Sequence, residues 1–333
     1  MNILVTGGAG YIGSHTLVKL IEQQYNPIVY DNFYNSSPES LLKVEKITGH
    51  KVKYFKGDIR DDEALNRIFS LYPFNAVVHF AGLKSASQSV LRPIEYYENN
   101  VLGSLNLFKT MMNHNVKAIV FSSSAAIYGN VTELPIKEDI QNLNPLNPYG
   151  KSKLIIENLL NDIYQIDNEW KIINLRYFNP IGAHHTGIIG ECSKHIQENL
   201  LPIIAKIVKD KNLTLNVFGA DYDTHDGTGI RDFIHIDDLA FGHIKALEKI
   251  IANQGIWNVN LGTGKGYSVL EIINTFEEVT GELVPYIKAP RRYGDISASF
   301  ADPSYAKKLL GWEAKKTLHE MIEDFWRWES NNK

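Results

Sequence analysis

The sequence predicts an α/β protein in which a doubly wound parallel sheet is followed by a smaller C-terminal α/β lobe. Short apolar runs rich in β-branched residues alternate with longer helical patterns in the first half, and a glycine-rich turn directly follows the first run. Beyond Asn179 this alternation gives way to stretches such as "GADYDTHDGTG" (219–229), which are typical of long loops. A chain of 333 residues can hold one large domain or two unequal ones.

The expected elements follow one another in a regular order. Continuously apolar runs predict buried parallel strands at 2–7, 27–32, 51–58, 75–82, 117–124 and 171–179. Helical patterns lie between them at 12–24, 61–71, 93–114 and from Pro148 onward. We expect a first domain over residues 1–178, to which the chain returns near 230–262, and a second domain over residues 179–333.

Composition limits the classes of function. Hydrophobic residues make up 44% of the chain and charged residues 22%, and the net charge is -4. Such a chain has no general attraction for nucleic acid or for acidic membranes. A small, specific ligand is therefore the expected partner.

Cysteine, histidine and the N-terminus give further expectations. Cys192 is the single cysteine and cannot form an internal disulfide, and "MNILVTGG" lacks a basic region or a long apolar segment. These features favour a cytoplasmic protein that is complete at its N-terminus. The eleven histidines show no metal-ligand spacing with cysteine or glutamate, and the adjacent His184 and His185 are interpreted as a loop pair. No metal is expected.

The turn after the first strand has the pattern of a phosphate-binding loop. "GGAGYIG" places Gly7, Gly10 and Gly13 where a strand turns into a helix. Glycine allows the backbone N–H groups to approach a pyrophosphate at the positive end of the helix. The alternative is a plain glycine turn. Asp31 ends the second strand, where its carboxylate can accept ribose hydroxyls and repel a 2′-phosphate, so NAD is favoured over NADP.

The stretch "NPYGKSK" (147–153) places a tyrosine and a lysine four residues apart. A helix starting near Pro148 puts Tyr149 and Lys153 on one face, where a cation can favour the phenolate. Roughly one such pair is expected by chance, so a solvated surface pair is the alternative. A tyrosine base needs cationic help because its pKa in water is about 10.

Several motifs together resemble a known superfamily. They are the glycine turn, "GDI" (57–59), "HFAGLK" (79–84), "FSSSAAIYG" (121–129), "YGKSK" (149–153) and "LRYFNPIGAH" (175–184). With them the chain resembles the extended short-chain dehydrogenase/reductases, which have a Rossmann fold. Within that superfamily it is most similar to the UDP-glucose 4-epimerase (UDP-galactose 4-epimerase) family. The resemblance runs from Asn2 to about Trp328.

The resemblance implies NAD as cofactor and assigns residues to it. The implied cofactor residues are Gly7, Gly10, Tyr11, Ile12, Gly13, Asp31, Asn32, Asn35, Ser36, Asp58, Ile59, Phe80, Ala81, Gly82, Lys84, Asn99, Ser124, Tyr149, Lys153 and Phe178. Core packing is an equally good interpretation of Phe80 and Ile59. A lysine between apolar runs, such as Lys84, costs free energy unless something pairs with it.

The implied chemistry is inversion at carbon 4 of a UDP-hexose through a 4-keto sugar. Tyr149 would remove the proton of the 4-hydroxyl, with Lys153 and the positive nicotinamide ring lowering its pKa and Ser124 bonding the same hydroxyl. Dehydratases and decarboxylases of this fold need further acid/base groups, whereas Ala125 and Ala126 follow the serine here. Two alternative functions remain: another NAD-dependent enzyme acting on sugar nucleotides, and an NAD(P) sensor without catalysis.

The resemblance also assigns the UDP-sugar residues. These are Lys84, Ser124, Tyr149, Asn179, Asn199, Leu200, Asn216, Phe218, Arg231, Arg292, Asp295 and Ser299. Arg231 and Arg292 would clamp the diphosphate, a task suited to guanidinium groups. Relatives restricted to plain hexoses have a tyrosine at the position of Ser299, so this small residue implies that UDP-N-acetylhexosamines are substrates too, or the main ones. The alternative is that Ser299 is a loop residue without a role in substrate choice.

The family pattern implies a homodimer. The helices near 93–114 and 150–165 are those that form a four-helix interface in the family. No nucleic-acid or membrane partner is expected.

Overall fold

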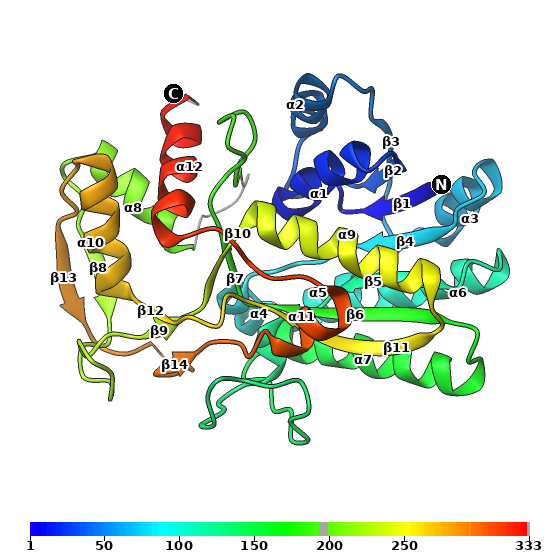
Figure 1. Ribbon diagram of the computed structural model, residues 1–333. Helices are drawn as coiled ribbons and strands as arrows, with labels where there is room; N and C mark the ends of the chain where they lie inside the picture. Colours follow the sequence, from blue (N-terminus) through cyan, green and yellow to red (C-terminus); the bar gives the residue numbers. More distant parts are fainter. Residues whose placement is uncertain (193–198, 293, 332–333) are drawn as a thin grey trace.

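The computed structural model describes residues 1–192, 199–292 and 294–331, and its centre is a parallel β-sheet (Figure 1). Within these residues the sheet has seven strands in the order β11-β6-β5-β4-β1-β2-β3, and all neighbours are parallel. The strands are β1 (Asn2–Thr6), β2 (Asn26–Asp31), β3 (Lys53–Lys56), β4 (Ala76–His79), β5 (Ala118–Ser122), β6 (Lys171–Tyr177) and β11 (Gly255–Leu261). The predicted fold class, a doubly wound parallel sheet with a smaller C-terminal lobe, is confirmed.

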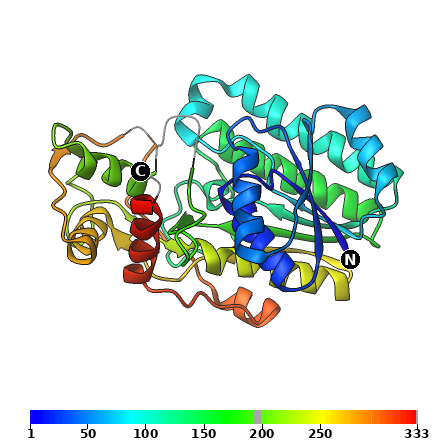
Figure 2. The same ribbon diagram turned by 90° about the horizontal axis from the view of Figure 1, so that it is seen from above.

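Helices cover both faces of the sheet because its strands are apolar on both (Figure 2). Along β1, Ile3 and Val5 belong to one hydrophobic cluster and Leu4 to the other, as expected when successive side chains alternate. Helices of the first cluster are α1 (Tyr11–Glu22), α2 (Pro38–Thr48), α9 (Ile236–Ala252) and α11 (Ser304–Leu310). Helices of the second are α3 (Asp62–Leu71), α6 (Gly103–Asn113) and α7 (Pro148–Ile166).

The helix expected over 93–114 is continuous but not uniform. It consists of α5 (Pro93–Tyr96), a π-helical segment η1 (Tyr97–Leu102) and then α6, and the short α4 (Ala86–Leu91) precedes it. π-helical turns inside α-helices are rare and are frequent at functional sites. This one carries Asn99 and Asn100.

Helix α2 is absent from the elements expected from the sequence, although its ends carry clear signals. The Ser37 side chain accepts a hydrogen bond from the Glu39 N–H, and Pro38 occupies the first turn. Gly49 ends the helix with φ of 70°, in the left-handed region that glycine tolerates.

The second lobe has its own apolar core, which includes Phe276, Phe325 and Trp328. Its helices are α8 (Leu200–Lys209), α10 (Val269–Thr280) and α12 (Leu318–Asn331). Its short strands are β7 (Asn179–Ile181), β8 (Leu215–Phe218), β9 (Ile230–Arg231), β10 (Phe233–His235), β12 (Tyr267–Ser268), β13 (Tyr286–Ala289) and β14 (Ala298–Ser299). They form sheets of two or three strands. The stretch 219–229 contains turns and bends only.

The chain crosses between the two regions more than once. After β10, helix α9 packs along α1, and β11 then pairs with β6 at the edge of the large sheet (Figure 1). None of the helices in the described residues is long and apolar enough to cross a membrane.

Candidate active site

The glycine turn lies between β1 and α1, and two of its glycines have no room for a side chain. Gly7 has φ of 68°, and a Cβ there would lie 2.7 Å from the Ala81 nitrogen. A Cβ on Gly13 would lie 2.6 Å from the Gly7 carbonyl oxygen. A Cβ on Gly10 would meet only that oxygen, at 3.3 Å, so this side of the turn is open. The open side faces the start of α1 at Tyr11, where unpaired N–H groups favour anions.

Asp31 ties the end of β2 to this turn. Its Oδ2 accepts a hydrogen bond from the Ala9 N–H at 3.0 Å, and its Oδ1 accepts from the Phe33 N–H and the Ser36 hydroxyl. Asn32 and Asn35 stand on the same segment, half-buried. The carboxylate therefore helps to shape the turn in addition to any ribose contact.

The next strand end carries Asp58 and Ile59. Asp58 accepts a two-pronged bond from Arg60, which lowers the pKa of Asp58 to about 2. Asn32 also donates to it at 2.9 Å. Ile59 is 5% exposed and packs in the core against Gly103, which agrees with a packing role for its side chain.

Residues 80–84 follow β4 and continue the same edge. The Phe80 ring packs 4.8 Å from the His243 ring, which agrees with a packing role. Lys84 is 52% exposed, so the cost expected for a buried lysine does not arise, and its Nζ lies 2.8 Å from the buried Glu191 carboxylate. Asn100, which the sequence reasoning missed beside the half-buried Asn99, binds both the N–H and the C=O of Leu83. The adjacent asparagines at 99 and 100 were the only signal for it.

The three candidate catalytic residues come together at the end of β5. Ser124 begins the short 3-10 helix η2 (Ala125–Ile127), and its Oγ accepts from the Ala126 N–H. Helix α7 starts one residue before Tyr149, with Asn147 as its cap and Pro148 in the first turn. Lys153 is 4% exposed and its Nζ lies 5.9 Å from the centre of the Tyr149 ring. The tyrosine–lysine pair is therefore not a solvated surface pair.

Burial dominates the electrostatics of this trio in the protein alone. The pKa of Tyr149 is raised by burial, and the hydrogen bond with Ser124 only partly opposes this. The pKa of Lys153 is lowered to about 7 by burial, against the raising effect of Glu157. In the protein alone, desolvation disfavours the charged forms of both side chains, so the expected lowering of the Tyr149 pKa by Lys153 and the nicotinamide ring stays a prediction for the complex with NAD.

A buried polar network below the trio was not found from the sequence. The Lys153 Nζ donates to the Ser122 carbonyl at 2.7 Å. Glu157, one turn further along α7, accepts from the Ser123 hydroxyl and forms a buried ion pair with Arg176 at 2.7 Å. The spacing of Lys153 and Glu157 on one helix face was an available signal, whereas Arg176 on β6 could not be paired with them by local pattern.

Phe178 and Asn179 lie where β6 passes into β7. Phe178 is 5% exposed and packs in a small cluster with Ala125, close to the serine. Asn179 bonds the Asp232 carbonyl through its backbone N–H and through its side chain. These contacts join the end of the large sheet to the second lobe.

The predicted substrate residues lie on short strands and turns of the second lobe. Arg231 on β9 and Arg292 both approach Asp295, at 4.0 and 2.8 Å. Ser299 on β14 is the register partner of Arg231. These four residues therefore lie close together.

The remaining substrate residues are more widely spread. Asn199 caps α8 and donates to Glu191, the partner of Lys84, and Leu200 begins that helix. Asn216 and Phe218 are exposed on β8, with the Arg292 guanidinium 4.9 Å from the Phe218 ring centre. In the stretch 184–198, residues 193–198 lie outside the described residues.

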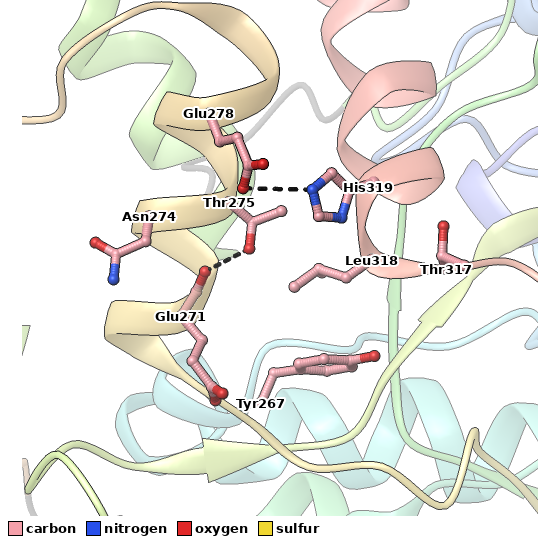
Figure 3. Close-up of a pocket in the computed structure, with 8 residues that line it drawn as sticks. All are labelled: Tyr267, Glu271, Asn274, Thr275, Glu278, Thr317, Leu318 and His319. Atoms are coloured by element: carbon pink, nitrogen blue, oxygen red, sulfur yellow. Dashed lines mark hydrogen bonds and ion pairs between the residues drawn. The ribbon is translucent and has the colours of Figure 1, made fainter.

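A hollow between α10 and the start of α12 contains none of the predicted site residues (Figure 3). Glu278 and His319 face each other across it at 3.4 Å, and Tyr267 and Glu271 lie at its other end. Neither the Ser124–Tyr149–Lys153 trio nor the glycine turn lines it.

Comparisons with known proteins agree with this geometry. Residues 3–262 match the NAD dependent epimerase/dehydratase family. The chain is 52% identical over 332 residues to the UDP-glucose 4-epimerase of Bacillus subtilis. The aligned region covers 100% of this chain and 98% of that protein. Both the resemblance inferred from the motifs and the expectation of NAD as cofactor are confirmed.

Solved structures lead to the same family. The UDP-glucose 4-epimerase of Bifidobacterium longum in complex with NAD+ and UDP has a TM-score of 0.96 and 48% identity, over 100% of this chain and 99% of that one. The UDP-Glc/GlcNAc 4-epimerase of Campylobacter jejuni has a TM-score of 0.86 and 35% identity, over 99% of each chain. The family match and the full-length likeness show that this chain belongs to the NAD-dependent epimerase/dehydratase family and, within it, to the UDP-glucose 4-epimerases.

Proposed function

We propose that this chain interconverts UDP-glucose and UDP-galactose by oxidation and re-reduction at carbon 4, with Tyr149 as the base. The observation that carries the proposal is the convergence of Ser124, Tyr149 and Lys153 at the carboxyl edge of the sheet. The glycine turn lies at the same edge, as ligand sites of doubly wound sheets do.

The residues at this edge fit an NAD molecule. The turn at Gly7 and Gly13 is too tight for side chains, while the side at Gly10 and the start of α1 is open for a pyrophosphate. Asp31 would accept the ribose hydroxyls, and residues 80–84 with Phe178 would line the nicotinamide half. NAD, when bound, would accept the hydride from carbon 4 and return it to the other face of the sugar.

The side chains would supply the proton transfer and the positioning. The Tyr149 phenolate would take the proton of the 4-hydroxyl and later return it, while the Ser124 Oγ holds that hydroxyl in place. Lys153 is anchored by the Ser122 carbonyl, so its amino group stays near the phenol. Because burial raises the pKa of Tyr149 in the protein alone, the phenolate has to be favoured once the ligands are bound.

The second lobe would hold the nucleotide. Two guanidinium groups that converge on one carboxylate, as Arg231 and Arg292 do on Asp295, can move onto a diphosphate and leave the carboxylate for a ribose. Residues 1–178 would then form the NAD-binding domain and residues 179–333 the UDP-sugar-binding domain, apart from the return of the chain at 230–262.

We extend the proposal to UDP-N-acetylglucosamine and UDP-N-acetylgalactosamine. Ser299 is paired in register with Arg231, so it stands beside the proposed diphosphate clamp, and its hydroxymethyl group leaves space that a larger side chain would fill. The Campylobacter jejuni relative with a TM-score of 0.86 is a UDP-Glc/GlcNAc 4-epimerase, which supports the wider substrate range.

We also propose that the protein is a homodimer through α4–α7. Leu91, Ile94 and Leu102 are 74%, 68% and 46% exposed, and the helices that carry the first two pack against α7. Size-exclusion chromatography with light scattering tests this. A wild-type mass of one chain would contradict it.

The activity is tested by incubating the purified protein separately with UDP-glucose and with UDP-galactose, and following the epimer by chromatography. We expect both incubations to reach the same final ratio of UDP-glucose to UDP-galactose, with no net formation of NADH. A 4-keto-6-deoxy product would instead indicate a dehydratase. No conversion in the presence of NAD would favour the sensor hypothesis.

A further inference from the structure

We propose that His184, His185 and Asp237 form a Zn²⁺ site that fastens the loop after β7 to the start of α9. Each residue offers one ligand atom, and these atoms lie within 4.8 Å of one another. Ligands of a tetrahedral zinc ion at about 2.1 Å are about 3.4 Å apart, so the His185 ring, which stacks 4.3 Å from that of His184, has to rotate to complete the set. His185 is exposed and can make this rotation, with water as the fourth ligand.

The ring of His184 is oriented as a metal ligand would be. It is 1% exposed, and its Nδ1 lies 2.8 Å from the Thr186 hydroxyl. Its Nε2 is buried and has no hydrogen-bond partner among the described residues. When Nδ1 donates to the Thr186 hydroxyl, Nε2 carries the lone pair that a metal would take, and the Thr186 N–H, 3.4 Å from the same Nδ1, is the competing contact.

Two buried hydrogen-bond acceptor atoms near the proposed zinc site have no donor among the described residues. Asp237 Oδ1 is buried and unpartnered among the described residues, as is Nε2 of His15, whose ring lies 6.5 Å from that of His184. The Nδ1 of His15 bonds the Tyr11 carbonyl at 2.8 Å, so its Nε2 carries a lone pair. Unpaired buried acceptors are costly, and a cation removes that cost.

The chemistry of the ligand set suits a metal ion. Asp237 also lines a surface hollow with Lys19, Glu22 and Lys316, so one of the three proposed ligands borders solvent there. Two imidazoles and one carboxylate are a zinc-type ligand set.

This site goes against the expectation of no metal drawn from the sequence. The His184–His185 pair was visible there, but Asp237 reaches it only because α9 packs along α1. The site is separate from the Ser124–Tyr149–Lys153 trio, and its proposed role is to hold the loop rather than to take part in the reaction.

The test uses tag-free protein with Cys192→Ser, which removes the exposed thiol as a competing ligand. After stripping with EDTA and addition of zinc followed by gel filtration, metal analysis should find one zinc per chain. Zinc at 100 times its dissociation constant should raise the Tm by about 3 °C. X-ray absorption at the zinc edge should show a nitrogen and oxygen shell at about 2.0–2.1 Å.

His185→Ala and Asp237→Asn should each abolish zinc retention and the Tm shift, and both should match stripped wild type in Tm without metal. The matched control is His319→Ala, which removes a histidine that faces Glu278 outside the proposed zinc site (Figure 3). This variant should retain zinc. The proposal is overturned if wild type retains no zinc, if the two cluster variants retain it, or if His319→Ala loses it.

Discussion

The two sides of the proposed active site are built in different ways. The cofactor side stands at the carboxyl ends of β1, β2, β4 and β5, four strands that are neighbours in one buried sheet. The substrate side stands on β9 and β14, strands of two residues each, and on the turn at Arg292 and Asp295. One side is thus fixed by a large core and the other by short-range pairing.

This difference has consequences for where the site can vary. A change at the sheet edge, such as a Cβ on Gly7 against the Ala81 nitrogen, meets rigid backbone. Ser299, by contrast, is half-buried on a short strand, where a different side chain changes the pocket more than the fold. We therefore expect chemistry to depend on the first side and substrate choice on the second.

The largest expected effect comes from Tyr149→Phe. Turnover should fall by at least about 100-fold, the usual loss for a general base, while NAD stays bound because the phenol is one contact among many. Coupled assays with UDP-galactose and a fluorescence titration with NAD measure the two quantities. Tyr164→Phe, on the same helix, is the control and should keep its activity. Near-normal turnover by Tyr149→Phe would sink the proposed base.

Ser299→Tyr tests the substrate side alone. The phenol ring should fill the space beside the sugar, abolish turnover of both UDP-N-acetylhexosamines and largely spare UDP-glucose and UDP-galactose. The plain pair serves as the internal control for folding. If the wild type ignores the acetylated sugars, or the variant still converts them, the role given to Ser299 fails and the 4-epimerase proposal stands.

Asp31→Ala should weaken NAD binding by about 10-fold or more, as expected for loss of charge-assisted hydrogen bonds, and should relax discrimination against NADP. It should also lower the Tm, because the Ala9 N–H and the Ser36 hydroxyl lose their acceptor. Asp31→Asn separates the two effects, since it keeps an acceptor but removes the charge. Wild type that prefers NADP in the same titration would contradict the assignment.

Lys153→Met should change how stability depends on pH. The pKa of Lys153 is about 7 in the folded protein against an ordinary value of 10.5, so between these pH values the unfolded chain binds more protons and stability rises with pH. The wild type without NAD should gain up to about 1.4 kcal/mol per pH unit from pH 7 to 9. Denaturant unfolding at several pH values measures this slope, and an equal slope in Lys153→Met would show that the lysine is not buried as a neutral group.

Much of the cofactor side could be predicted from the sequence because its signals are local. Most strands were visible as apolar runs because both faces of a parallel sheet are buried, and the glycine turn follows β1 while Asp31 ends β2. The expectation of a buried strand was wrong for β3, which lies at the edge of the sheet and is largely exposed. Helix α2 was missed although Ser37, Pro38 and Gly49 marked its ends. The π-helical turn at 97–102 could not be foreseen, because the same sequence periodicity fits an uninterrupted α-helix.

The sequence by itself determined the order of most elements and the glycine turn, because each depends on residues a few positions apart, while the family resemblance supplied the proposed Ser124, Tyr149 and Lys153 set. Only the tertiary structure decided that burial raises the pKa of Tyr149 and lowers that of Lys153. It also decided that Glu157 meets Arg176 and that Asp237 meets the two histidines. Desolvation and contacts between distant segments arise from packing, and no spacing within one segment encodes them.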